Sequence, residues 1–144
     1  MIKEIINSIY PISNTAFRKL EPIVEYTTFD KNKIFINKNK PNKNEYIVIE
    51  GICKSFLINP DGEDITISFF QDKSVISPYT CRTLNGISML YFQTLSEMKV
   101  AVINAKLFEK LMIEDIEIRE FGNTVLRNEL MRKVKKEIGL ASLT

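Results

Sequence analysis

The first part of the chain carries apolar residues at helical spacing. Within Ile2–Ile9 the apolar positions fall on one side of a helix, and Pro11 ends that pattern. Ser13 precedes a second short helix, Asn14–Leu20, as an N-cap residue, and Pro22 stops it. The pattern therefore predicts two short helices before any strand.

After these helices the period of the pattern changes to two. In Asp64–Phe70, Ile65, Ile67 and Phe69 alternate with polar residues, as on a strand with two different faces. The preceding Asn59-Pro-Asp-Gly62 indicates a hairpin, because glycine accepts the positive φ of a tight turn. Eight strands are predicted, at Val24–Phe29, Lys33–Asn37, Glu45–Glu50, Ile52–Ile58, Asp64–Phe70, Ser74–Ile76, Ser88–Leu95 and Lys99–Ile103.

Two helices are predicted after the last strand. Asn104 is placed to cap a short one, Ala105–Met112, and a longer one starts at about Asp115 and frays or bends near Gly139. The longer helix carries an apolar stripe made of Ile118, Phe121, Val125, Leu126, Leu130, Val134 and Ile138. A helix of about 25 residues is about 37 Å long, more than a small roll of strands can cover. We therefore expect its distal half to pack on the same helix of a second copy, which gives a homodimer.

Composition narrows the classes of function. A length of 144 residues suits one domain, and a formal charge of +2 gives no electrostatic reason to expect nucleic acid or an anionic membrane as a partner of this segment. The chain contains no histidine, which removes Ser-His-Asp and Cys-His catalysis and most transition-metal sites. These facts predict a protein that is not an enzyme and that holds neither metal nor cofactor.

The sequence also predicts a cytoplasmic location. Lys3 and Glu4 interrupt the first apolar cluster, so the N-terminus does not resemble a signal peptide. No apolar stretch approaches the ~20 residues needed to span a bilayer. Cys53 and Cys81 have no metal-like spacing, and we expect both to be reduced thiols.

Taken together, these elements resemble the sensor domain of Crp/Fnr-type transcription regulators over essentially the whole chain. The resemblance implies a mostly β fold with flanking helices: a double-stranded β-helix (a jelly-roll-like β-roll) followed by a long C-terminal dimerisation helix. It places the sensor roll at residues 1–112 and the long helix at 113–144. The motifs that carry it are Phe29–Phe35, Tyr46–Gly51, Asn59–Phe70, Val100–Asn104 and Lys106–Leu111.

In this family a DNA-binding helix-turn-helix normally follows the long helix. An effector repositions this DNA-binding module by changing the orientation of the long helices. Here the sequence stops at Ala141–Thr144, about where that module would begin. We therefore expect a piece of a longer regulator that contacts DNA only through a helix-turn-helix not present in this chain. A free-standing sensor is the other interpretation.

The cyclic-nucleotide-binding members of the family carry a phosphate-binding cassette with a Gly-Glu pair and a later arginine. This sequence has Ser77-Pro78 in place of the pair and Ser88-Met89 in place of the arginine. A buried cyclic phosphate without a cationic partner keeps much of its desolvation penalty. Arg82 is either a displaced partner for the anion or a solvent-facing residue of a short helix. We therefore expect no tight binding of cAMP or cGMP.

The pocket is expected to hold a different small molecule or none. The residues expected to line its site come from the cassette and from the long helix, which would close over it. They are Ser77, Pro78, Tyr79, Arg82, Ser88 and Met89 in the cassette, and Arg127, Asn128 and Arg132 on the helix. For the aromatic and methionine positions, packing in the core is the favoured interpretation.

Three other functions fit the pattern less well. A free-standing cyclic-nucleotide-binding-like module that acts through protein partners would need the missing cassette residues, unless Arg82 replaces the arginine. A cupin-like enzyme has a similar roll but generally holds a metal with histidines, and this chain has none. Iron–sulfur sensing of the Fnr type uses several cysteines near the N-terminus, and none precedes Cys53.

Overall fold

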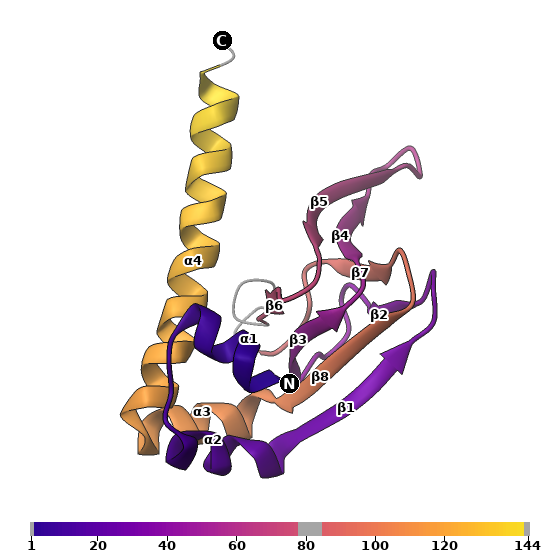
Figure 1. Cartoon of the computed structure of the whole chain (residues 1–144). Helices are drawn as coiled ribbons and strands as arrows, with labels where there is room; N and C mark the ends of the chain where they lie inside the picture. The colour runs from indigo at the N-terminus through magenta and orange to yellow at the C-terminus, as the bar shows by residue number, and fades with distance from the viewer. Residues whose placement is uncertain (1, 78–84, 143–144) are drawn as a thin grey trace.

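Two four-stranded antiparallel sheets form the body of the protein in the computed structural model, which describes residues 2–77 and 85–142 (Figure 1). The strand order is β1-β8-β3-β6 in one sheet and β2-β7-β4-β5 in the other. The strands are β1 (Val24–Phe29), β2 (Ile34–Ile36), β3 (Asn44–Glu50), β4 (Cys53–Ile58), β5 (Asp64–Phe70), β6 (Val75–Ile76), β7 (Tyr91–Thr94) and β8 (Met98–Asn104). This arrangement confirms the double-stranded roll expected from the sequence.

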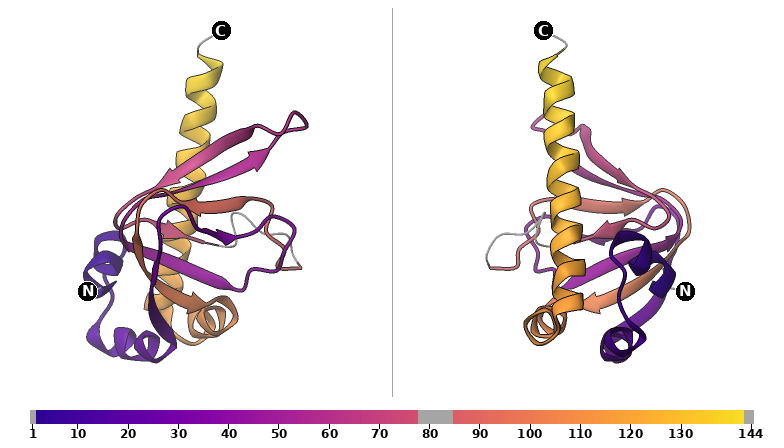
Figure 2. Two further views of the ribbon diagram at one scale, coloured as in Figure 1. Left: turned by 90° about the vertical axis from the view of Figure 1, so that its right-hand side faces the viewer. Right: turned by 60° about the vertical axis from the view of Figure 1, so that its left-hand side comes forward.

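Helices cover one side of the roll, and the last of them extends beyond the strands (Figures 1 and 2). Helices α1 and α2 lie beside the lower part of α4, and α3 leads into α4 through a sharp corner. The helical segments are α1 (Ile2–Ile9), α2 (Asn14–Leu20), a 3₁₀ turn (Glu21–Ile23), α3 (Ala105–Glu114) and α4 (Ile116–Ala141). None of the helices within residues 2–77 and 85–142 combines the length and apolar character that crossing a bilayer requires.

Strand β3 is buried on both faces because the interior of the roll lies on one side and the helices lie on the other. Tyr46 and Val48 belong to the cluster inside the roll, together with Phe92. Ile47 belongs to the cluster under the helices, together with Phe121 of α4. A shared sheet therefore connects the packing of α4 with the interior of the roll.

The predicted strands are found, but four of them are shorter than expected, two of these by a single residue. The segment Lys33–Asn37 contributes only Ile34–Ile36 to a sheet, and Ser88–Leu95 contributes only Tyr91–Thr94. The wrong boundary at Ser88 has a physical reason: its backbone N–H and C=O bond to Lys40 and Asn39 in the β2–β3 loop rather than to a strand.

The two last helices are longer than predicted. Helix α3 continues to Glu114, and α4 passes through Gly139 to Ala141, so this glycine does not end the helix. The Ser142 N–H still donates to the Ile138 carbonyl oxygen at 3.0 Å. One glycine in a helix costs only about 1 kcal/mol, which the flanking turns tolerate.

The β4–β5 hairpin has the turn that its sequence predicts. The Asn59 side-chain oxygen accepts hydrogen bonds from the N–H groups of Asp61 and Glu63, and Gly62 has φ +82°. In β5 the alternation also holds, but Ile65 and Phe69 are exposed while Phe70 is buried. The apolar side of this strand therefore faces outward.

Candidate functional site

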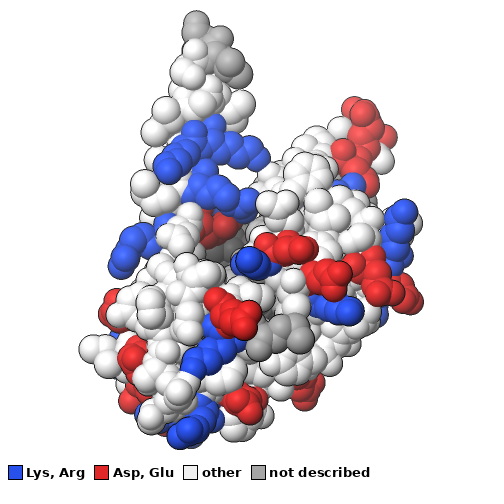
Figure 3. All heavy atoms as spheres, in the orientation of Figure 1, with Lys and Arg blue, Asp and Glu red and all other residues white. Residues whose placement is uncertain are grey.

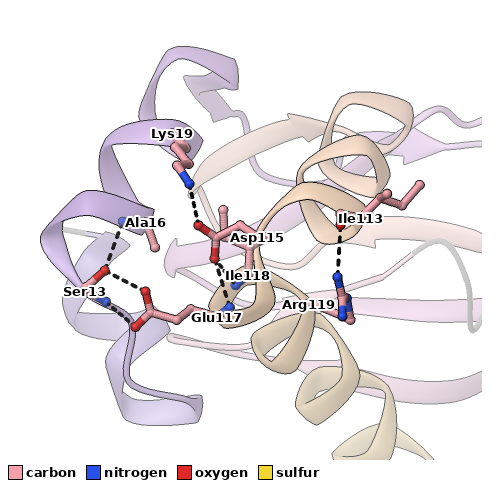
Figure 4. Close-up of polar contacts among 8 residues, drawn as sticks. All are labelled: Ser13, Ala16, Lys19, Ile113, Asp115, Glu117, Ile118 and Arg119. Carbon is pink, nitrogen blue, oxygen red and sulfur yellow. Dashed lines mark hydrogen bonds and ion pairs between the residues drawn. The ribbon is translucent and has the colours of Figure 1, made fainter.

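The corner between α3 and α4 is built around Asp115, which caps α4. Its carboxylate accepts hydrogen bonds from the N–H groups of Glu117 at 2.9 Å and Ile118 at 3.2 Å (Figure 4). The Arg119 guanidinium donates to the carbonyl oxygens of Met112 and Ile113, at 2.8 and 2.9 Å. These bonds satisfy backbone N–H groups at the start of α4 and backbone carbonyl oxygens at the end of α3. They thereby fix the direction in which α4 leaves the roll.

The N-terminal helices are tied to this corner by two polar contacts (Figure 4). The Lys19 ammonium lies 2.9 Å from the Asp115 carboxylate. The Ser13 hydroxyl and backbone N–H both donate to the Glu117 carboxylate, at 2.6 and 3.1 Å, and the Ser13 oxygen also caps α2 by accepting from the Ala16 N–H. Any movement of α4 at its base must therefore move α2 or break these contacts.

The lower half of α4 packs closely on α3 and the sheet. The Phe108 and Phe121 rings meet edge to face at 6.2 Å, and Gly122 lets the Met112 thioether lie against the α4 backbone. A cavity of about 20 Å³ remains between these residues and the buried Glu45 and Ser77. Such a volume holds about one water molecule, so it cannot take an effector.

Of the predicted cassette residues, Ser77 and Ser88 are buried and hydrogen-bonded, and Met89 is exposed. The Ser77 hydroxyl donates to the Glu45 carboxylate at 3.1 Å. The Ser88 hydroxyl donates to the Leu90 carbonyl oxygen at 2.7 Å. The three remaining cassette residues, Pro78, Tyr79 and Arg82, lie outside the described residues.

Aromatic rings fill the interior of the roll. Phe35 stacks on Phe29 with ring centres 4.9 Å apart and meets the Tyr46 ring at 5.4 Å. The Phe70 and Phe92 rings lie 5.7 Å apart on the side nearer α4. Within the described part of the chain, contacts among these aromatic rings therefore stabilise the interior of the roll.

Two basic residues of α4 reach across to β5. The Arg132 guanidinium lies 5.1 Å from the centre of the Phe70 ring, donates to the Phe69 carbonyl oxygen at 3.4 Å and pairs with Glu129 at 2.8 Å. The Lys136 ammonium donates to the Ile67 carbonyl oxygen at 2.6 Å. The distal half of α4, which we expected to pack on a second copy, therefore also contacts the roll through two exposed basic side chains.

A groove of about 250 Å³ opens between α4, the end of α1 and the β5–β6 turn. Figure 3 shows the hollow between α4 and the body of the roll, with basic and acidic side chains around it. Asn128 and Arg132 line this groove from the helix, as does Glu129, while Lys73 and Ser74 line it from the turn. Arg127 is exposed and does not line it.

The structure thus brings two of the nine predicted site residues, Asn128 and Arg132, into one groove. Sequence reasoning missed Lys73, Ser74 and Glu129 at this place. The available signal was weak: a polar stretch, Gln71–Lys73, between two predicted strands, with Ser74 at the start of the second. Nothing in that stretch indicates that α4 passes beside it.

The opposite side of α4 carries exposed apolar residues. Leu130 and Ile138 are each 63% exposed and Val134 is 42% exposed, and Met131 lies beside them. They follow one another at helical spacing along the side that faces away from the roll. These large apolar side chains form a continuous exposed row on α4.

No protein-family model matches this chain, and no curated protein matches it either. Solved structures share its fold at low sequence identity, and three of them are described here. A cyclic nucleotide-binding domain from Methylobacillus flagellatus KT has a TM-score of 0.77 and 15% identity, covering 94% of this chain and 77% of its own. The sensor domain of the transcriptional regulator DNR from Pseudomonas aeruginosa has a TM-score of 0.75 and 12% identity, covering 93% and 91%.

The third is the catabolite activator protein of Thermus thermophilus, with a TM-score of 0.73 and 11% identity. The match covers 93% of this chain and 62% of that protein. The fold is therefore that of cyclic nucleotide-binding domains and of Crp/Fnr-type sensor domains, as the sequence motifs predicted.

Proposed function

We propose that this chain is the effector-sensing and dimerisation domain of a bacterial Crp/Fnr-type transcription regulator. The observation that carries the proposal is the two-sided character of α4. One side packs on the roll through Ile118, Phe121 and Val125, and the other presents Leu130, Val134 and Ile138 to solvent. A helix of this kind suits a role in which the roll sets the orientation of α4 and of the α4 helix paired with it.

In the proposed mechanism an effector binds better to one arrangement of roll and helix than to the other. Only such a difference in affinity can shift the equilibrium between the two arrangements. The paired helices would pass the change to a DNA-binding module attached beyond them. This function requires no catalysis by the chain.

Cyclic nucleotides are not the proposed effectors. The Ser77 and Ser88 hydroxyls, which occupy cassette positions, already bond to the Glu45 carboxylate and the Leu90 carbonyl oxygen. A cyclic phosphate there would face no guanidinium at the position that Ser88-Met89 take in this sequence. Its desolvation penalty would remain largely uncompensated.

Sedimentation equilibrium tests the dimer directly. The proposal predicts a mass of twice 16.7 kDa at micromolar concentrations. Leu130→Asp would place two like charges at the contact, which costs several kcal/mol, and we expect it to weaken the dimer by about a hundredfold or more. Ile58→Asp, at an exposed apolar position on the hairpin, is the matched control. A monomeric wild type, or equal behaviour of the two variants, would contradict the proposal.

A further inference from the structure

The groove between α4 and the β5–β6 turn has two cations on its rim and an apolar floor. Lys73 reaches it from the turn and Arg132 from the helix, with Glu129 as its carboxylate. Val75 and Val125 form the floor. The rim therefore carries a surplus of positive charge next to apolar surface, a combination that suits a small molecule with one anionic group.

Lys73 has a backbone conformation that is unfavourable for a lysine residue. Its φ is +71°, and the other two non-glycine residues with positive φ among those described, Asn32 and Asn39, are of a type that tolerates this region. Such backbone costs about 1 kcal/mol for a residue like lysine. A glycine or asparagine would make the turn more easily, so the presence of an ammonium group here needs a reason other than folding.

The turn holds Lys73 in a fixed place. The Lys73 N–H donates to the Val48 carbonyl oxygen and the Val48 N–H donates to the Ser74 carbonyl oxygen, both at 2.8 Å. The Gln71 N–H bonds to the Ser74 hydroxyl at 3.1 Å. These bonds fix the turn to β3, while no ion pair joins Lys73 to another of the described residues.

Arg132 can donate hydrogen bonds to a further partner. Its guanidinium has five N–H donors, and the bonds to Glu129 and to the Phe69 carbonyl oxygen use two of them. The second bond is long, at 3.4 Å, and the side chain is 45% exposed. A carboxylate or phosphate in the groove can therefore bind Arg132 through charge-assisted hydrogen bonds without displacing Glu129.

We propose that this groove is the effector site and that it binds a small organic anion with a carboxylate or phosphate group. Lys73 and Arg132 hold the anionic group, Asn128 bonds to a neighbouring polar group, and the apolar part lies on Val75 and Val125. Lys73 and Ser74 precede β6 in the chain, whereas the cassette positions follow it. Of the described cassette residues, neither Ser77 nor Ser88 nor Met89 lines the groove.

The inference rests on the proposed sensing function and deepens it. Lys73 belongs to the roll and Arg132 belongs to α4, so an anion that binds both adds a tie between the two. That tie exists only in the arrangement of α4 that brings Arg132 over the turn. Binding would therefore favour this arrangement over any in which α4 moves away.

The test is an NMR titration of the ¹⁵N-labelled chain with inorganic phosphate and, separately, with succinate at constant ionic strength. We expect saturable shifts of the backbone amides of Lys73, Ser74, Val125 and Asn128 with at least one of the two. Lys73→Gln and Arg132→Gln should each weaken binding by about tenfold. Lys135→Gln, on α4 but outside the groove, should leave the affinity unchanged.

Each outcome has a distinct meaning. Saturation with only one of the two anions identifies the group that the site binds. Shifts that do not saturate, or that survive in both groove variants, overturn the site. Sedimentation of the same samples separates this failure from that of the proposed function, because a dimer that binds neither anion rejects only the groove.

Discussion

At the scale of single residues, Asp115 joins the N-terminal helices to α4. Its carboxylate caps α4 and receives the Lys19 ammonium at 2.9 Å. The hydrogen bond from Lys19 holds the pKa of Asp115 below its usual value, burial opposes it, and the bonds from the Ile118 and Glu117 N–H groups support it. One charged group therefore sets both the start of α4 and its attachment to α2.

The contribution of this charge depends on pH. Because the folded pKa of Asp115 lies below the unfolded value of about 3.9, the carboxylate stabilises the fold above that value and loses its effect as pH falls through the folded pKa. Asp115→Asn keeps a capping side chain but removes the charge. We expect it to lower the free energy of unfolding by about 0.5–1 kcal/mol at neutral pH, where the partner lysine is half exposed.

Urea unfolding of wild type and Asp115→Asn, at neutral pH and again at a pH well below that unfolded pKa, measures this effect. The difference between the two proteins should shrink at the lower pH. Lys19→Gln should cause a similar loss at neutral pH, and the double variant should lose less than the sum of the two. A difference that is the same at both pH values would show that the Asp115 charge makes no such contribution.

At the scale of elements, two basic side chains of α4 reach the outer edge of β5. Among the described residues this strand is the last one in its sheet, so no described strand pairs with its outer carbonyl groups. Lys136 and Arg132 donate to two of them, on Ile67 and Phe69. These two bonds attach the distal part of α4 to β5, far from the corner at Asp115 where the helix begins.

Lys136→Gln tests this contact. Loss of the charged donor should raise the rate of amide hydrogen exchange about fivefold in the distal turns of α4 and in β5, because such a bond is worth about 1 kcal/mol. Lys135→Gln, which removes a neighbouring exposed charge, should leave exchange in both segments at the wild-type rate. Unchanged exchange in both variants would mean that the contact does not hold the helix.

Local signals in the sequence predicted the elements well. Ser13, Asn104 and Asn59 each bond to nearby backbone groups, as short-range rules require, and the helices and hairpin they define are present. The contact between Ser13 and Glu117 joins residues 104 positions apart, and no local rule identifies it. The groove was missed for the same reason, because Lys73 meets α4 only after the roll has folded.

At the scale of the whole molecule, α4 separates two surfaces with different proposed roles. Toward the roll lies the groove with Lys73, Asn128 and Arg132. Away from the roll lies the exposed row with Leu130, Val134 and Ile138. A change in how α4 lies on the roll can reach a second copy only if the exposed rows of two α4 helices pack on each other, and this pairing is the central claim of the proposed function.

Disulfide trapping at Val134 tests that claim most directly, because a bridge forms only when two Cα atoms come within about 7 Å. The background needs little change: burial raises the pKa of Cys53 to about 12, which makes it unreactive, and Cys81, outside the described residues, is replaced by serine. In a symmetric pair of α4 helices, Val134→Cys should give a covalent dimer on mild oxidation, and Lys135→Cys should not. A chain that stays monomeric with Cys at 134, or that cross-links equally at both positions, would contradict the account.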